Sequence, residues 1–317
     1  MQTAAAHSGR ENAVAAPGLM VERKSAFPQW LRKPIPRHGK RKAVQECIRQ
    51  NSLHTVCDEA RCPNRNECFG SGTATFLIMG DICCRNCRFC SVSHGTPQPL
   101  DPQEPARLLD AVTNMKLSYV VITMVTRDDL GDGGAQHMAR TISLLKRERS
   151  GVRVEVLVSD FKGDTAPVLA VLCARPDVFG HNIEAVPSVF EKIRPQADYA
   201  ASLRVLRYAA QNSGGALIKS GFMVGLGETE EEVVALLQDL YRSNVSMITI
   251  GQYLQPTKNQ TPVSAIITPQ QFERYGSLAR EMGFESVFAG PFVRSSYRAA
   301  EVFKNETPAV RGSCGIA

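Results

Sequence analysis

Short apolar runs alternate with amphipathic segments from residue 74 onward. Six of these runs are brief and rich in β-branched residues, which is typical of buried parallel strands. Their sequences are ATFLIM, SYVVITMV, VRVEVLVS, DVFGHNIE, LIKSGFMVG and SMITIGQYL. We therefore predict six strands separated by helices.

The segments between the runs have the apolar spacing of helices. Residues at i, i+3, i+4 and i+7 lie on one helix face, and two segments follow this pattern. The first is Leu108, Ala111, Val112 and Met115, and the second is Val233, Leu236, Leu237, Leu240 and Tyr241. We expect both stripes to pack against the sheet.

Capping residues mark the ends of two predicted helices. Thr229 with Glu232 forms a capping box, and Thr268 with Gln271 forms another around Pro269. Gly283 suits the position that ends the second of these helices.

Alternating strands and helices predict an α/β fold, which we interpret as a partial (β/α)6 TIM-type barrel with N- and C-terminal extensions. A doubly wound sheet is the alternative. We divide the chain into a basic, partly disordered arm (1–43), an N-terminal extension (44–73), the barrel (74–283), a C-terminal extension (284–303) and a disordered tail (304–317).

Composition and charge narrow the class of protein to which the chain can belong. The chain is 43% hydrophobic and has no apolar run long enough to cross a bilayer, and its N-terminus lacks the apolar segment of a secretory signal, so we expect a cytoplasmic protein without a membrane partner. Residues 1–56 contain ten Lys/Arg and three Asp/Glu, a net charge of +7. This arm is a solvated segment, a docking surface for an acidic partner, or a nucleic-acid contact, and no recognised module supports the last.

Ten cysteines without a secretory signal favour metal binding over disulfides. Cys173 is an exception, because it lies in an apolar helical pattern where we expect it to pack into the core.

Four cysteines fall within DICCRNCRFCSV, residues 81–92, directly after the first predicted strand. Cys83, Cys87 and Cys90, here called the barrel triplet, have the C-x3-C-x2-C spacing that folds a short loop around one inorganic centre. We interpret Cys84 as a bystander, because adjacent residues rarely ligate one cluster. A structural zinc site needs four ligands and only His94 lies nearby, whereas three thiolates match a [4Fe–4S] cluster with one open iron.

Cys57, Cys62 and Cys68, here called the N-terminal triplet, precede the first strand with C-x4-C-x5-C spacing. Offsets of five and eleven residues do not share one helix face, and Pro63 and Gly70 predict a loop. A zinc knuckle or free thiols are possible here, but the nearby barrel triplet favours a second cluster.

The barrel triplet, with Phe89 before its last cysteine at the end of the first strand, resembles the radical S-adenosylmethionine (SAM) superfamily. Both triplets together with the sequence RSSY at 294–297 resemble the lipoyl synthase family from about residue 44 to 302. The resemblance implies that SAM binds the open iron, and that a serine completes the second, auxiliary cluster. That serine is Ser296, with Ser295 as second choice.

The same resemblance places other residues near SAM. Gly133 and Gly134, in TRDDLGDGGAQ, correspond to the glycine motif that receives the methionine amino group. The acidic residue usual after these glycines is missing, and Asp132 precedes them instead.

Polar residues at later strand ends are further SAM candidates. Asn182 and Glu184, in HNIE, end the fourth strand, and Lys219 with Ser220 lies in the fifth. We expect no catalytic role for His181. The sequences GLGETEEE and QYLQPT are expected to border the site.

The resemblance implies insertion of two sulfurs, at C6 and C8 of an octanoyl chain amide-linked to a lysine, with the auxiliary [4Fe–4S] cluster as sulfur donor. Implied partners are octanoylated carrier domains (2-oxoacid dehydrogenase E2 or glycine cleavage H protein), an electron donor such as ferredoxin or flavodoxin, and an iron–sulfur carrier. The alternatives are a methylthiotransferase, a biotin-synthase-like enzyme, or a zinc-binding nucleic-acid module.

Overall fold

The computed structural model describes residues 28–33 and 39–306. Residues 307–317 of the predicted disordered tail, with Cys314, and most of the basic arm lie outside the described residues. Residues 304–306, which we also predicted to be disordered, form the end of a helix instead. Within the described part, eight strands form one sheet in the order β1-β2-β5-β6-β7-β8-β9-β10. The strands are β1 (His54–Thr55), β2 (Thr75–Ile78), β5 (Tyr119–Met124), β6 (Arg153–Leu157), β7 (Val178–Gly180), β8 (Leu217–Val224), β9 (Met247–Gln252) and β10 (Ser286–Gly290).

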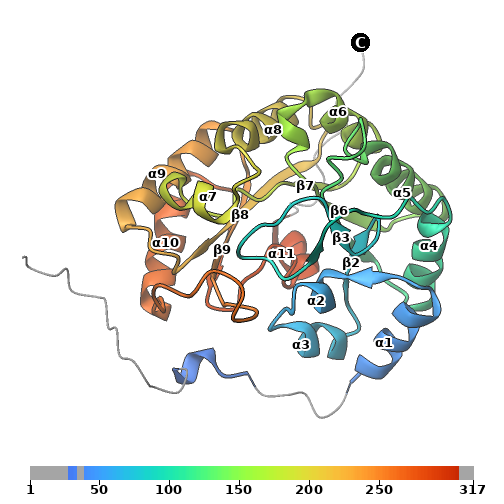
Figure 1. Ribbon diagram of the computed structural model, residues 1–317, viewed down its shortest axis with the longest axis horizontal. Coiled ribbons are helices and arrows are strands. Elements are labelled where there is room, and N and C mark those ends of the chain that lie inside the picture. The colour runs from blue at the N-terminus through green and yellow to red at the C-terminus, as the bar shows by residue number, and fades with distance from the viewer. Residues whose placement is uncertain (1–27, 34–38, 307–317) are drawn as a thin grey trace, which may run out of the picture.

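All six predicted strands are present, as β2 and β5–β9. Their neighbours are parallel, while β1 pairs antiparallel with β2 through His54–Leu77 and Thr55–Phe76. The strands follow chain order without the reversal that a doubly wound sheet has, so the barrel interpretation is confirmed. Figure 1 shows the curved sheet inside an outer layer of helices.

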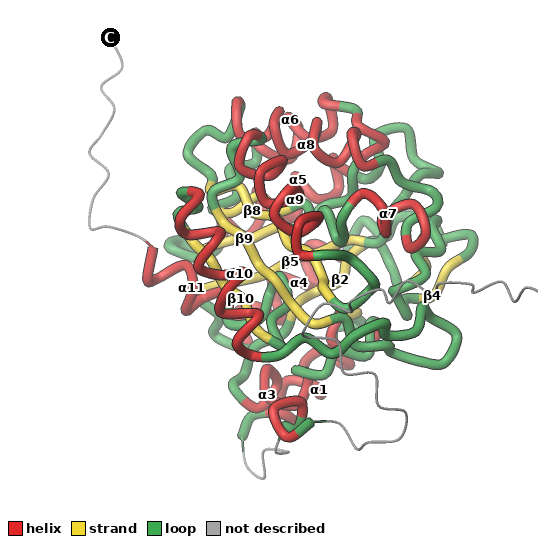
Figure 2. Tube along the Cα trace, turned by 90° about the vertical axis from the view of Figure 1, so that its left-hand side faces the viewer, coloured by secondary structure: helices red, strands yellow, loops and turns green. Residues whose placement is uncertain are grey.

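Helices follow the strands and cover the outside of the sheet (Figure 2). They are α4 (Glu104–Asn114), α5 (Ala135–Glu148), α6 (Thr165–Cys173), α7 (Pro187–Ile193), α8 (Tyr199–Gln211), α9 (Glu230–Arg242) and α10 (Pro269–Met282). The other helical segments are α1 (Arg41–Gln50), α2 (Val56–Glu59), α3 (Arg65–Gly70), α11 (Ala299–Glu306) and the 3-10 turns η1 (Gln29–Leu31) and η2 (Phe161–Gly163). Two short strands, β3 (Ile82–Cys83) and β4 (Ser93–His94), pair with each other beside the sheet.

The core lies between the sheet and the helices. Phe76, Ile122 and Phe179 come from neighbouring strands and are fully buried, as are Leu108 and Leu236 from the helices. Burying a side chain of this size contributes roughly 1.5–3 kcal/mol to stability. The predicted helix stripes therefore hold the barrel together.

Two details of the helix stripes differ from the prediction. Tyr241 is 48% exposed, because it lies at the edge of the α9 stripe and packs edge-on against Phe284 instead. Cys173 is exposed rather than in the core. The buried face of α6 contains Val168, Val171 and Leu172, and the next residue turns away from it.

The predicted caps are largely confirmed. Thr229 and Glu232 make the full capping box at α9, and Gly283 ends α10 with a left-handed φ of 101°. The Thr268 side chain accepts a hydrogen bond from the backbone N–H of Gln271. The predicted reciprocal bond, from the Thr268 backbone to the Gln271 side chain, is not made within the described residues. The Gln271 amide donates to Glu230 at 2.9 Å instead and so links α10 to α9.

The last strand, β10, was not predicted. It pairs in parallel with β9 over Ser286–Gly290 and extends the sheet into the C-terminal extension. Its sequence, SVFAG, is only partly buried and lacks the aliphatic run of the other strands. This strand places the following residues, 291–298, at the open end of the barrel.

Gly134 begins α5 because no larger residue fits there. Its φ is 86°, and a Cβ at this position would lie 2.3 Å from the sulfur of Met79. The residue before it, Gly133, is also left-handed, with a φ of 60°. The two glycines thus let the β5–α5 loop pass close to the first strand.

We expect Gly134→Ala to lower the free energy of unfolding by about 2 kcal/mol, from backbone strain and the clash with Met79. Gly131→Ala is the control, since a Cβ there meets nothing within 4 Å. Chemical denaturation measures both variants. Equal stability of the two would contradict this account of Gly134.

Candidate functional site

A cavity of about 330 Å³ opens at the carboxyl ends of the strands, and both cysteine triplets line it. The N-terminal triplet (Cys57, Cys62 and Cys68) comes from the helices before the barrel, and the barrel triplet (Cys83, Cys87 and Cys90) comes from the loop after β2. The chain thus brings together two sets of thiols that are separate in the sequence.

The barrel triplet lies in a loop whose backbone N–H groups point at sulfur. The backbone N–H groups of Arg85 and Thr126 donate to the Cys83 sulfur at 3.4 and 3.3 Å, and that of Val92 donates to Cys90 at 3.5 Å. Such donors stabilise a thiolate. Burial acts in the opposite direction and raises the pKa of Cys90 to about 12.

The N-terminal triplet is held by two short helices rather than by the predicted loop. Cys57 lies in α2 and Cys68 in α3, with Cys62 in the turn between them. Thr55 caps α2 by accepting a hydrogen bond from a backbone N–H of its first turn, and Gly70 is the last residue of α3. The helical pattern was missed because each helix is little more than one turn long.

Burial keeps four of the six thiols, those of Cys57, Cys68, Cys87 and Cys90, protonated at neutral pH when no metal is bound. Burial raises the pKa of Cys57 to about 12 and that of Cys68 to about 11, and it also raises the pKa of Cys87. A bound metal displaces these protons, so binding becomes tighter as pH rises.

Each triplet presents three thiols to the cavity. Among the described residues, no group of three or more His, Cys, Asp or Glu side chains is arranged to hold a single metal ion. A structural zinc site takes four ligands, whereas a [4Fe–4S] cluster with one open iron takes three thiolates. The chemistry of the donor set thus fits such a cluster at each triplet.

The neighbouring cysteines have other partners. The Cys84 thiol donates to Asp129 at 3.0 Å and does not line the cavity, as expected of a bystander. Cys47 lies in α1, and its sulfur is 3.9 Å from the backbone oxygen of Ala111.

The two serines of RSSY differ in their partners. The Ser295 hydroxyl donates to the Asn182 side-chain oxygen at 2.7 Å, and its backbone oxygen accepts from Lys219 at 2.5 Å. Ser296 also lines the cavity, but its hydroxyl makes no hydrogen bond to the described residues. Ser296 is therefore the serine that is available as a ligand.

The SAM candidates divide into two groups. Phe89, Asn182 and Glu184 line the cavity together with the triplets. Glu184 has a left-handed φ of 73°, a strained conformation that is often found at functional sites. Burial raises the pKa of the Glu184 carboxyl, against the attraction of Arg194 and Arg294.

Asp132, Gly133, Gly134 and Lys219 are outside the cavity lining. Asp132 caps α5, accepting hydrogen bonds from two backbone N–H groups of its first turn at 2.9 Å. Lys219 is buried and donates to Glu155 at 2.7 Å. Both charges are thus already partnered within the fold.

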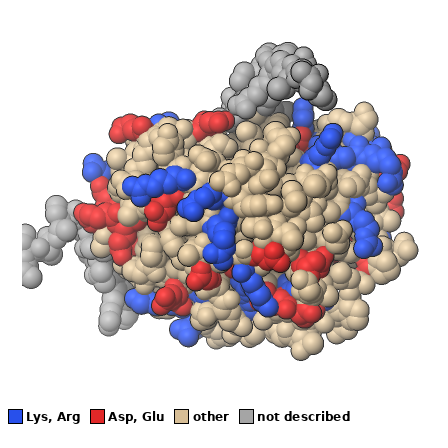
Figure 3. All heavy atoms as spheres, turned by 90° about the horizontal axis from the view of Figure 1, so that it is seen from above, with Lys and Arg blue, Asp and Glu red and all other residues tan. Residues whose placement is uncertain are grey.

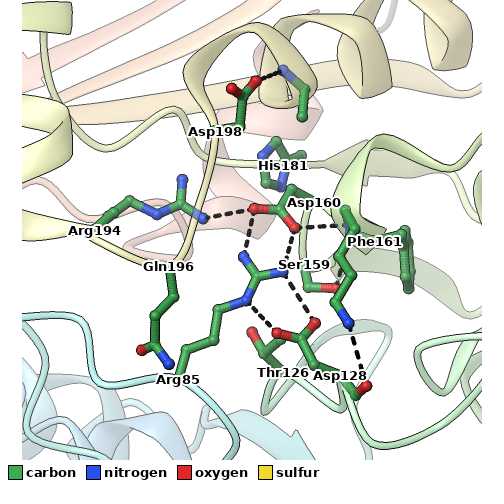
Figure 4. Close-up of polar contacts among 12 residues, drawn as sticks. Arg85, Thr126, Asp128, Ser159, Asp160, Phe161, His181, Arg194, Gln196 and Asp198 are labelled. Atoms are coloured by element: carbon green, nitrogen blue, oxygen red, sulfur yellow. Dashed lines mark hydrogen bonds and ion pairs between the residues drawn. The ribbon is translucent and has the colours of Figure 1, made fainter.

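A buried ion-pair network, which the sequence did not predict, supports the barrel triplet (Figure 4). Arg85, within the triplet, is 4% exposed and donates to Asp128 at 2.7 and 3.0 Å and to Asp160 at 2.6 and 2.7 Å. Arg194 donates to Asp160 at 3.4 Å. Burial alone would raise the pKa of Asp160, but the hydrogen bonds from Arg85 hold it at about 2.

The network joins the cysteine loop to two strand ends. Asp128 follows β5 and Asp160 follows β6, so one guanidinium ties residues 83–90 to the barrel mouth. Acidic residues directly after two predicted strands were the sequence signal for this site. The spacing alone did not identify which cation they would bind.

His181 lies among these charges and has one free ring nitrogen. Its Nδ1 donates to the Val158 oxygen at 2.9 Å, and its buried Nε2 has no hydrogen-bond partner among the described residues. Burial, helped by Arg194, lowers the pKa of His181 to about 4, so the ring is neutral at pH 7. Because His181 lines the cavity, its Nε2 is available to accept a hydrogen bond from a bound molecule.

We expect Asp160→Asn to lower the free energy of unfolding by about 3 kcal/mol, because it leaves the buried Arg85 without its main counter-charge. Asp128→Asn is the matched control and should cost less, since that side chain is 24% exposed. Denaturation of the metal-free variants measures both. Equal losses would contradict a special role for Asp160.

We expect His181→Gln to change the pH dependence of stability. The folded pKa lies below the usual 6.5, so the unfolded chain binds the proton first and wild-type stability falls between about pH 6.5 and pH 4. Removing the group should flatten this decline by up to about 3 kcal/mol. Replacing the exposed His94 serves as the control, and an identical profile for His181→Gln and wild type would contradict the assignment.

Comparisons with known proteins agree with this geometry. Residues 77–240 match the Radical SAM superfamily. The chain is 52% identical over 288 residues to a lipoyl synthase of Rubrobacter xylanophilus, covering 91% of this chain and 89% of that one. It is 50% identical over 273 residues to one from Coxiella burnetii (86% and 87%), and 48% identical over 301 residues to one from Laribacter hongkongensis (94% and 96%).

Solved structures support the fold alone. A maturase of the [FeFe]-hydrogenase, HydG, matches with a TM-score of 0.54 and 16% identity, covering 68% of this chain and 55% of that one. Streptococcus suis SuiB bound to S-adenosylmethionine matches with a TM-score of 0.51 and 8% identity, covering 67% and 49%. With relatives near 50% identity over most of its length, the chain belongs to the lipoyl synthase family of radical SAM enzymes.

Proposed function

We propose that this enzyme inserts two sulfur atoms, at C6 and C8 of an octanoyl chain attached to a lysine of a lipoyl carrier protein. The observation that supports this most is the shared cavity, which both cysteine triplets line. Sulfur insertion needs the group that removes hydrogen and the group that donates sulfur to reach the same substrate carbons. One cavity between two cluster sites meets that need.

The barrel triplet would hold a [4Fe–4S] cluster with an open iron for SAM, and the N-terminal triplet would hold the auxiliary cluster. When bound, these groups supply a carbon-centred radical that abstracts hydrogen from unactivated C–H bonds, and the sulfur that replaces it. The protein binds and orients them and keeps water away. Both assignments are supported by the three thiols that each triplet presents to the cavity.

The cavity walls suit an alkyl chain. Leu77, Val125, Leu157, Phe222 and Leu254 line the same cavity as the two triplets. An apolar wall binds an octanoyl group through the hydrophobic effect and excludes water that would quench a radical. The carrier lysine would then lie at the mouth, where the chain enters.

We propose Phe89, Asn182 and Glu184 as SAM contacts, with Arg194 beside them. All four line the cavity near the barrel triplet. A cation and a carboxylate together complement the carboxylate and amino groups of an amino acid. Gly133 and Gly134 remain candidates for the amino group through their backbone, while Asp132 and Lys219 would act by supporting the loop and Ser295.

Ser296 is our proposal for the fourth ligand of the auxiliary cluster. Its free hydroxyl and its place in the cavity lining support it over Ser295, whose hydroxyl is bound to Asn182. Iron binds a serine oxygen less strongly than a thiolate. A labile bond suits a cluster that is consumed as the sulfur donor.

The remaining partners are proposals from the family: E2 or H-protein carrier domains, a ferredoxin- or flavodoxin-like electron donor, an iron–sulfur carrier, and a cytoplasmic setting. The nine described cysteines are all free thiols, which fits a reducing compartment. None of the described helices combines the length and apolar character that a membrane-crossing helix needs. Much of the basic arm proposed to bind an acidic carrier, including Arg37, lies outside the described residues.

The face in Figure 3 mixes both signs of charge, with Lys and Arg beside Asp and Glu. A nucleic-acid module would instead concentrate basic residues on one face. On the face shown, this mixture does not favour a broad nucleic-acid surface.

Replacing Cys83, Cys87 and Cys90 by Ala should abolish formation of 5′-deoxyadenosine, because SAM loses its iron. Replacing the N-terminal triplet should leave SAM cleavage measurable and stop sulfur insertion. Cys84→Ala is the matched control and should retain both activities, since Cys84 binds Asp129 outside the cavity. Lipoyl product from the N-terminal triplet variant would show that the sulfur-donor assignment is wrong.

A further inference from the structure

Lys33 joins three segments of the chain at one point. Its ammonium group donates to the Asn64 side-chain oxygen at 2.6 Å, to the Glu67 carboxylate at 2.5 Å and to the Tyr297 hydroxyl at 3.3 Å. The side chain is 21% exposed, so these contacts are partly shielded from water. Lys33 lies before the barrel, Asn64 and Glu67 belong to the N-terminal triplet region, and Tyr297 belongs to RSSY.

Two aromatic rings complete the environment of the cation. The Lys33 ammonium lies 4.5 Å from the ring centres of both Phe292 and Tyr297. Cation–π contacts of this kind strengthen as water is excluded. Tyr297 in turn stacks on Phe288 of β10 at 6.2 Å, which anchors the group to the sheet.

The other two segments, one with Asn64 and Glu67 and one with Phe292 and Tyr297, also contact each other directly. The Tyr297 hydroxyl donates to Glu67 at 2.7 Å, and the Asn64 side chain donates to the Phe292 oxygen at 2.7 Å. Lys33, Asn64, Glu67, Phe292 and Tyr297 are here called the clasp. Lys33 supplies a partly buried positive charge, while Arg298 reaches Glu67 at 3.1 Å from an exposed position.

The clasp residues stand next to the proposed auxiliary-cluster ligands in the chain. Glu67 precedes Cys68, and Tyr297 follows Ser296. A displacement of either clasp residue therefore moves a ligand relative to its partners. Asn64 and Tyr297 also line the cavity, whereas Lys33, Glu67 and Phe292 do not.

We propose that Lys33 is a positioning residue that holds Ser296 against the N-terminal triplet and so controls how readily the serine ligand leaves the auxiliary cluster. This inference rests on the proposed function, because it requires Ser296 to bind that cluster. The clasp would thereby control the breakdown of the auxiliary cluster, whose sulfur is used in the reaction. Movement of the 28–33 segment would open the clasp without changing any ligand.

The test uses full-length protein in which the barrel triplet is replaced by Ala, so that all cluster iron belongs to the auxiliary site. Iron release to a chelator is followed by absorbance after anaerobic reconstitution. Lys33→Met should release iron about tenfold faster, since a charge-assisted group of hydrogen bonds is lost. Lys33→Arg should restore most of the wild-type rate, and Arg298→Met, at the exposed edge of the same carboxylate, should change it less than about twofold.

A second measurement needs no cluster. Hydrogen–deuterium exchange of the metal-free protein should show faster exchange at residues 291–298 in Lys33→Met than in Arg298→Met. Tyr297→Phe removes a single hydroxyl and should release iron at a rate between those of wild type and Lys33→Met. This variant tests the proposal even if Lys33→Met does not take up a cluster.

Ser296→Ala distinguishes the two levels of the account. Fast iron release in Ser296→Ala with wild-type release in Lys33→Met and Tyr297→Phe would overturn the role of Lys33 and leave the proposed function intact. If Ser296→Ala released iron at the wild-type rate, Ser296 would not be a ligand of the auxiliary cluster, and the role proposed for Lys33 would be wrong as well. Fast release in Ser296→Ala and in Lys33→Met, with normal release in Arg298→Met, is the expected result.

Discussion

The burial of Arg85 against two carboxylates is the interaction on which the site depends. A charge at 4% exposure is tolerated only with full pairing, and Asp128 and Asp160 provide it from the ends of adjacent strands. Because Arg85 lies between Cys83 and Cys87, its pairing fixes the cysteine loop to the barrel mouth. Asp160 also pairs with Arg194 beside the cavity, and His181 nearby is kept neutral by burial, with help from Arg194.

The second constraint is that the two thiol sets come from distant parts of the chain. The helices before the barrel and the segment after β10 meet over the open end of the sheet, and contacts such as Asn64 to Phe292 join them. The cavity is thus closed by the two extensions rather than by the barrel alone. The barrel triplet is thus held at the strand ends, whereas the N-terminal triplet region meets the RSSY segment through contacts between residues far apart in the sequence.

Features that depend on residues close together in the sequence were predicted well. The six central strands, the α9 capping box and the cysteine sets are local features that spacing alone reveals. Long-range pairings were not accessible in this way. Nothing near Arg85 identifies Asp160, which is 75 residues away, and nothing near Lys33 identifies Tyr297, which is 264 residues away. β10 was missed because its weak apolar pattern is stabilised by pairing with β9.

The central claim is that both triplets hold clusters that face one cavity. Iron and acid-labile sulfide analysis of the anaerobically reconstituted wild-type protein tests it most directly. Two [4Fe–4S] clusters predict about eight iron and about eight sulfide per chain, with no zinc. A plateau at about four of each, or stoichiometric zinc in place of iron at the N-terminal triplet, would contradict the account.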